Sequence, residues 1–155
     1  MGDPRPGHPE GAVVHHVAEV LTNVDRYNGP GEERRRLRIV GSTHDTFKHL
    51  VDHSKPRVGE NHHGMIARRF TEGFTNDLVV LEIVELHDEA FNAWSMGARD
   101  PNRWGEAEER ARRLVERLGR SLPLYRRFYR CDNETGTKSQ ECLGWFERLC
   151  ALETH

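Results

Sequence analysis

The sequence lacks a long apolar run and an excess of charge of either sign. No apolar stretch approaches the roughly 18 residues of a membrane-spanning helix, and the N-terminal MGDPRPGHPEG has no segment typical of a signal peptide. Lysine and arginine total 23 against 25 acidic residues, so no overall basic field favours nucleic acid. These absences argue against a membrane-spanning protein and against nucleic acid as the main partner.

Cysteine is scarce as well. The three cysteines, Cys131, Cys142 and Cys150, include no C-x-x-C pair. An odd number without metal-type spacing predicts reduced thiols that pack as small apolar residues. Such thiols are typical of a cytoplasmic protein.

Strand-type alternation is also missing, whereas helical periodicity recurs along the chain. The helical segments expected from this periodicity cover about residues 11–27, 32–53, 62–72, 77–96, 105–118, 123–132 and 139–152. A length of 155 residues suits one domain. The sequence therefore predicts a single all-α domain over residues 1–155, a bundle of about six to seven helices. Its functional core would span about residues 8–138, followed by the C-terminal helix at about 139–152.

Histidine, by contrast, is abundant, with ten in the chain. Imidazole is the side chain most often used as a metal ligand or proton carrier near neutral pH. Five of the expected helices place a histidine or an aspartate among apolar residues at helical spacing. In chain order these polar residues are His16, His44 with Asp45, His62 or His63, His87 and Asp132.

Burial of one such group costs several kcal/mol unless it finds a hydrogen-bond or charge partner. A shared metal satisfies them together, because neutral imidazole nitrogens and carboxylate oxygens are common ligands of transition metals. The pattern predicts a site for one or two divalent ions, Fe, Mn, Co or Zn, with Mg as a further option.

The order of these residues resembles the HD domain superfamily. THDTFK (residues 43–48) is similar to the family's His-Asp-x-x-Lys signature, although Phe47 stands where a glycine is usual. HPEG (residues 8–11), followed by His16, is similar to the opening of many HD domains, and YRCD (residues 129–132) to the closing aspartate segment. The resemblance covers roughly residues 8–138 and implies an all-helical metal-dependent enzyme.

The resemblance implies a site with one metal or with two. The one-metal form needs His16, His44, Asp45 and a final aspartate. The two-metal form adds His87 and one of His62 and His63, with Asp45 between the ions. The final aspartate is expected to be Asp132, which ends an apolar helix, and the alternative is Asp88 beside His87.

The activity implied by the resemblance is hydrolysis of a phosphate ester in a small phosphorylated molecule, such as a nucleotide, by metal-activated water. Lys48, one turn after His44, is the candidate to hold the phosphate. Asp45, Lys48 and His63 are the candidate catalytic residues, and whichever of His62 and His63 does not bind metal could act as general acid. Aromatic candidates for the pocket wall are Phe47, Trp94 and Tyr129.

Two other functions stay open at this point. Some HD proteins with the larger ligand set resemble di-iron oxygenases, and the ligand types suit iron as well as they suit manganese, cobalt or zinc. The chain could also be a non-catalytic ligand- or partner-binding module that a metal stabilises. The sequence does not decide whether the protein forms a homodimer.

Overall fold

The computed structural model describes residues 13–153, and every regular element in that range is helical. The α-helices are α1 (Val13–Tyr27), α2 (Glu32–Thr43), α3 (His63–Glu72), α4 (Leu78–Leu86), α5 (Glu89–Arg99), α6 (Trp104–Leu118), α7 (Leu122–Asn133) and α8 (Glu141–Glu153). Short 3-10 turns are η1 (Lys48–Leu50), η2 (Gly59–Asn61), η3 (Pro101–Arg103) and η4 (Gly119–Ser121). The expected all-α class is confirmed. The HPEG segment of the HD resemblance lies outside the described residues.

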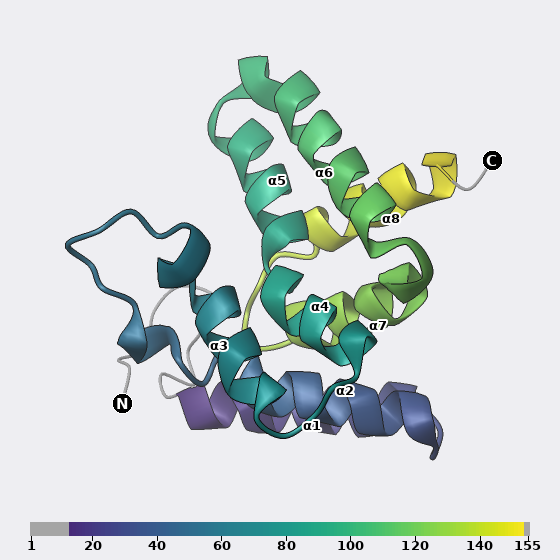
Figure 1. Ribbon diagram of the computed structural model, residues 1–155. Coiled ribbons are helices and arrows are strands. Elements are labelled where there is room, and N and C mark those ends of the chain that lie inside the picture. The colour runs from purple at the N-terminus through teal and green to yellow at the C-terminus, as the bar shows by residue number, and fades with distance from the viewer. Residues whose placement is uncertain (1–12, 154–155) are drawn as a thin grey trace.

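The helices pack in two groups that meet at α7, while α4 leads along the chain from the first group into α5 of the second (Figure 1). In the first group α1 lies against α2 and α7, while α4 packs on α2 and α3. In the second, α5 and α6 run side by side and α8 packs against both. No helix of the described residues is long and apolar enough to cross a membrane.

The core is built on α4 and α7. Five of the nine residues of α4 are buried, namely Val80, Leu81, Ile83, Val84 and Leu86. A helix that is apolar on most sides is stable only inside a protein, which explains its central position. The three cysteines are buried and free, as predicted.

The second expected helix ends at Thr43 instead of running on to about residue 53. Side chains bind the carbonyls of its last turn, since His44 Nδ1 lies 3.0 Å from the Gly41 oxygen and the Thr46 hydroxyl donates to Ser42 at 2.7 Å. Such local side-chain bonds compete with continuation of the helix. The end matters because neighbouring residues of an α-helix point in different directions, whereas here His44 and Asp45 face the same cluster.

The fourth expected helix is broken into α4 and α5 between Leu86 and Glu89. The hydroxyl of Tyr125 lies in the break, where it donates to the Leu86 carbonyl at 3.0 Å and accepts from the Ala90 amide at 3.2 Å. It thus replaces the direct bond between that amide and that carbonyl, and insertion of a side chain into the helical ladder is a recognised cause of a kink. The residues at the break are His87 and Asp88.

Candidate metal centre

Five parts of the chain bring histidine and aspartate side chains to one buried region. His16 comes from the first turn of α1, His44 and Asp45 from the end of α2, and Asp132 from the last turn of α7. His63 is the first residue of α3, and His87 lies at the break between α4 and α5. Two groups among these side chains could hold a metal ion, and a third joins His63 to two neighbouring residues.

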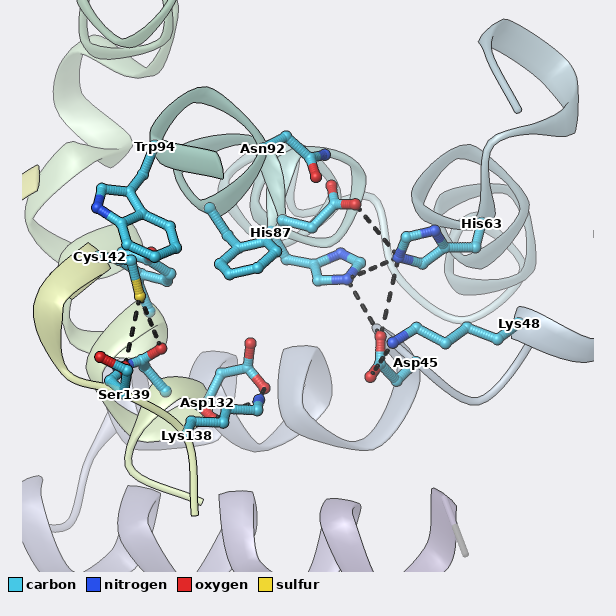
Figure 2. Close-up of a pocket in the computed structure, with 14 residues that line it drawn as sticks. Asp45, Lys48, His63, His87, Asn92, Trp94, Asp132, Lys138, Ser139 and Cys142 are labelled. Carbon is cyan, nitrogen blue, oxygen red and sulfur yellow. Dashed lines mark hydrogen bonds and ion pairs between the residues drawn. The ribbon is translucent and has the colours of Figure 1, made fainter. Parts of the chain in front are cut away.

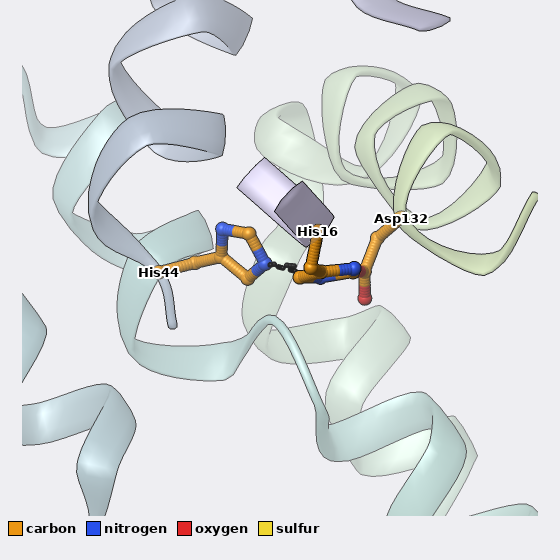
Figure 3. Close-up of side chains that lie close together, drawn as sticks. All are labelled: His16, His44 and Asp132. Carbon is orange, nitrogen blue, oxygen red and sulfur yellow. Dashed lines mark hydrogen bonds and ion pairs between the residues drawn. The ribbon is translucent and has the colours of Figure 1, made fainter. Parts of the chain in front are cut away.

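The first group consists of His16, His44 and Asp132 (Figure 3). The Nε2 atom of His16 lies 2.9 Å from Asp132 Oδ1 and 3.4 Å from Nε2 of His44. His44 Nε2 is 3.5 Å from the same aspartate oxygen. Their side chains are at most 15 % exposed, so the group is almost sealed from solvent.

The second group consists of Asp45, His63 and His87 (Figure 2). His87 Nε2 lies 3.1 Å from His63 Nε2 and 3.2 Å from Asp45 Oδ1. The other oxygen of Asp45, Oδ2, lies 3.5 Å from His16 Nε2 and 3.8 Å from His44 Nε2. Asp45 therefore turns one oxygen toward each group, the position that a bridging carboxylate would take.

The tautomers of the histidines suit a metal. Nδ1 of His87 lies 2.8 Å from the Val84 carbonyl, and Nδ1 of His44 faces the carbonyls of its own helix. Because a carbonyl only accepts, each Nδ1 carries a proton, and Nε2 is the nitrogen that faces the cluster. Burial opposes protonation of His87, but the bond to Asp45 and the charges of Asp88 and Asp45 raise its pKa, so this Nε2 holds a proton that a metal ion would replace. His16 has a comparable arrangement: its Nδ1 faces the Thr135 hydroxyl at 3.3 Å, and the proton of that hydroxyl goes to the Asp132 carbonyl. Outer hydrogen bonds of this kind orient metal-binding imidazoles.

Nε2 lone pairs that face one another repel unless a cation lies between them or a ring gains a proton. A second indication of a metal site is Asp132 Oδ1. This oxygen is buried and makes no hydrogen bond of good geometry within the described residues, although His16 Nε2 is near. Such buried acceptors require a partner. The donor set of imidazole nitrogens and carboxylates fits a divalent transition metal.

The electrostatics keep the carboxylates charged. Burial alone would raise the pKa of Asp45, but the neighbouring His44, the bond from His87 and the Lys48 ammonium lower it well below its usual range. Burial likewise opposes ionisation of Asp132, and Lys138, His16 and His44 together lower its pKa. Burial and the nearby His87 lower the pKa of His63 to about 4, so this ring is neutral at neutral pH and its lone pair is available.

His62 lies apart from the second group. Its Nδ1 accepts the Gly64 amide proton at 3.2 Å, so its Nε2 carries a proton, and this atom lies 3.3 Å from Asp88 Oδ2. Asp88 in turn lies 3.6 Å from His63 Nε2. His62, His63 and Asp88 form the third group that could hold an ion. Of the alternatives left open by the sequence, His63 joins Asp45 and His87, and Asp132 rather than Asp88 joins His16 and His44.

Gly64 allows α3 to approach α4 closely enough for this contact. A Cβ atom at this position would lie 2.3 Å from the Glu85 carbonyl oxygen, which is backbone. The neighbouring His63 thus reaches His87 because residue 64 has no side chain.

A pocket of about 400 Å³ opens beside the cluster. Asp45, His63, His87 and Asp132 line it, together with Lys48, whose Nζ lies 2.6 Å from Asp45 Oδ2 (Figure 2). Trp94 and Tyr129, two of the aromatic candidates, are also in the wall. The third, Phe47, packs instead on Phe70, with ring centroids 4.4 Å apart.

Two residues of the site were missed by the sequence analysis. Lys138 lines the pocket and donates to the Asp132 carbonyl at 3.0 Å, and Thr135 supports His16. Both lie in the segment between α7 and α8, where no helical period relates a residue to a face. The only available signal was their proximity in sequence to Asp132.

Neither the models of known protein families, nor curated protein sequences, nor solved structures match this chain. Membership of the HD superfamily therefore stays a prediction from the motif, and the geometry of the cluster has to carry the functional argument.

Proposed function

We propose that this protein is a metal-dependent hydrolase of the HD type that acts on small phosphate esters. The observation that carries the proposal is the convergence of His16, His44, Asp45, His63, His87 and Asp132 beside a pocket with a lysine in its wall. Imidazoles and acids from five parts of a chain rarely share one buried region without a common partner.

Two ions are the arrangement that the side chains favour. His16, His44 and Asp132 would hold one ion, His63 and His87 the other, and Asp45 would bind both, since its two oxygens face different groups. Divalent metals in such a site act as Lewis acids toward a phosphoryl oxygen and make water a better nucleophile at neutral pH.

The protein's own residues supply binding and orientation. Lys48 extends into the pocket with its side chain 36 % exposed, and its ammonium can pair with a phosphate oxygen. Asp45 fixes the lysine at 2.6 Å beside the metal ligands. His62 directs its Nε2 proton at Asp88, which keeps that carboxylate beside His63. Trp94 and Tyr129 make part of the wall apolar and limit access of bulk water.

The test combines metal analysis with an assay of nucleotides and other small phosphoesters in the presence of Mn²⁺, Co²⁺, Fe²⁺ or Mg²⁺. We expect about two ions per chain and hydrolysis that a chelator removes and added metal restores. His44→Ala should abolish activity, while His49→Ala is the matched control because His49 is exposed and outside the three groups.

Hydrolysis that persists after complete metal removal would contradict the proposal, as would a metal-loaded protein that cleaves none of these esters. Bound iron together with oxygen consumption on addition of substrate would favour the oxygenase reading instead. A protein that binds metal and is inactive in both assays would point to the non-catalytic module.

A further inference from the structure

Two tyrosines that stack on α7 differ in what their hydroxyls bind. The ring centroids of Tyr125 and Tyr129 are 6.3 Å apart. The Tyr125 hydroxyl has partners in the break between α4 and α5. The Tyr129 hydroxyl is buried and makes no hydrogen bond of good geometry with any residue that the structure describes, although the Cys142 thiol lies near it. The residue is only 2 % exposed and lines the pocket.

A buried hydroxyl without a hydrogen-bond partner destabilises a fold. A protein retains such a group mainly where a ligand or an ordered water forms the hydrogen bond. Burial, followed by the neighbouring Cys142 thiol, raises the pKa of Tyr129. The phenol therefore keeps its proton and can act as a donor. The thiol is a poor partner, because sulfur is a weak acceptor and the Cys142 proton is directed at Asn133 Oδ1 at 3.1 Å.

Lys138 provides a cation in the same wall of the pocket. Its side chain is 19 % exposed, and its Nζ lies 3.0 Å from the carbonyl and 3.5 Å from Oδ1 of Asp132. Tyr129 precedes Asp132 by three residues on α7, so the two residues share a helix face. Lys138 lies beside Asp132, whereas Lys48 lies on the other side of the cluster beside Asp45 (Figure 2). The helix spacing therefore places both donors, Tyr129 and Lys138, at the Asp132 end of the pocket.

The other polar groups of this wall are already paired. The Asn133 amide donates to the Ser139 carbonyl and to Gln140, and its oxygen accepts from Cys142. The Ser139 hydroxyl oxygen accepts the Glu141 amide proton, and Phe91 and Trp94 present aromatic rings. Asn92 lies above His87, away from Lys138 (Figure 2). Apart from Asp132 itself, whose Oδ1 would bind an ion, the hydrogen-bonding capacity left at this end of the pocket is that of two donors, one of them charged. The environment is partly dry, and such bonds are strong there.

We propose that Tyr129 and Lys138 form an oxyanion subsite, which binds a second acidic group of the substrate while the phosphate to be cleaved lies near Lys48 and the metal ligands. The inference rests on the proposed function and narrows its substrate class to phosphate esters that carry a further carboxylate or phosphate. Tyr129 and Lys138 are then specificity-determining residues.

Binding to the manganese-loaded full chain tests the subsite without turnover. The probes are phosphonoacetate, 3-phosphonopropionate and 4-phosphonobutyrate, and a matched series of alkylene bisphosphonates of increasing length. Ethylphosphonate, which has no second acidic group, is the reference ligand. Within each series the length of the probe varies, so that one member can reach from the metal ligands to Tyr129 and Lys138. Comparison of the carboxylate series with the bisphosphonate series shows which second acidic group binds more tightly.

We expect at least one bifunctional probe to bind about tenfold more tightly than ethylphosphonate, as one charge-assisted hydrogen-bonded contact implies. Lys138→Met should remove this gain, and Tyr129→Phe should reduce it about fivefold. Lys55→Met is the control, because Lys55 is exposed and pairs only with Asp52 among the contacts described for its side chain. Absence of any gain, or a gain that survives in both pocket variants, would overturn the subsite.

Stability gives a second, ligand-free measurement. Tyr129→Phe should unfold at the same temperature as the wild type or higher, since it removes a hydroxyl without a partner, whereas Tyr125→Phe should unfold at a lower temperature. A clear loss of stability in Tyr129→Phe would mean that the hydroxyl is satisfied within the protein, contrary to the proposal. Tight binding of a bifunctional probe to a protein that shows no metal-dependent hydrolysis would reject the proposed function alone. Metal-dependent hydrolysis without tighter binding of any bifunctional probe would reject the subsite alone.

Discussion

The two ligand groups of the candidate centre are built on different kinds of backbone. His16 and Asp132 lie within helices and His44 directly caps one, so the packing of α1, α2 and α7 holds the first group in place. Asp45, His63 and His87 lie in a turn, at a helix start and at a helix break. The first group is thus a part of the core, while the second is carried by chain irregularities beside the pocket. We infer that the first contributes mainly to stability and the second mainly to activity.

Substitution of one histidine in each group should have the largest effect and tests whether the two groups differ in their contributions to stability and activity. His44→Ala removes a fully buried candidate ligand, and we expect loss of activity and a decrease of about 2–4 kcal/mol in the free energy of unfolding. His63→Ala should abolish activity as well, but lower stability by about 1 kcal/mol or less, since this side chain is 17 % exposed at the pocket. Urea unfolding of both metal-loaded variants measures the difference. Equal destabilisation would show that the groups do not divide in this way.

Metal removal should sharpen the same contrast. Ions that bind only the folded state stabilise it by about 3 kcal/mol at a hundredfold excess over the dissociation constant, so chelation should lower the unfolding temperature by roughly 5–10 °C. We expect the ion of the second group to leave first, because the pocket gives a chelator access to it. Metal content, activity and unfolding temperature followed together during chelation should therefore show activity lost before most of the stability. Simultaneous loss of all three would contradict two distinct groups.

Gly64→Ala addresses the second group through the backbone. The added methyl group would collide with the Glu85 carbonyl, so α3 must shift away from α4 and carry His63 with it. We expect loss of one ion per chain and a decrease in stability of about 1–3 kcal/mol from the overpacked contact. The matched control is Gly105→Ala, where a Cβ meets nothing within 4 Å at the start of α6, and it should be neutral or slightly stabilising. Unchanged metal content in Gly64→Ala would contradict the role of the close approach.

Lys48→Met should give the smallest change, confined to the open side of the centre. Loss of one ammonium–phosphate contact predicts a decrease of roughly 10–100-fold in kcat/KM for a phosphate ester, with metal content and unfolding temperature near those of the wild type. Lys55→Met, outside the pocket, should retain full activity. A wild-type kcat/KM in Lys48→Met would remove the lysine from the proposed mechanism.

Helical periodicity was sufficient to locate some of the centre in advance. His16 and His44 stand out because an imidazole occupies a position that the apolar face would otherwise fill, and both are buried in the structure. The all-α class and the buried free cysteines follow from the same kind of local information. Where two candidates were adjacent or both plausible, as for His62 and His63 or Asp88 and Asp132, periodicity could not choose. The choice depends on where helices begin and break. The local bond from the Gly64 amide to His62 and the distant hydroxyl of Tyr125 determine these points.

Sequence alone thus determined the all-α class, most of the helical segments, their apolar faces and the identity of the polar residues on those faces, because these follow from spacing along a single helix. Only the tertiary structure decided which of those residues meet. The hydroxyl of Tyr125, on α7, separates α4 from α5. The absence of a side chain at Gly64 allows the close approach of α3 to α4. Contacts between distant segments depend on such individual atoms, which no local pattern records.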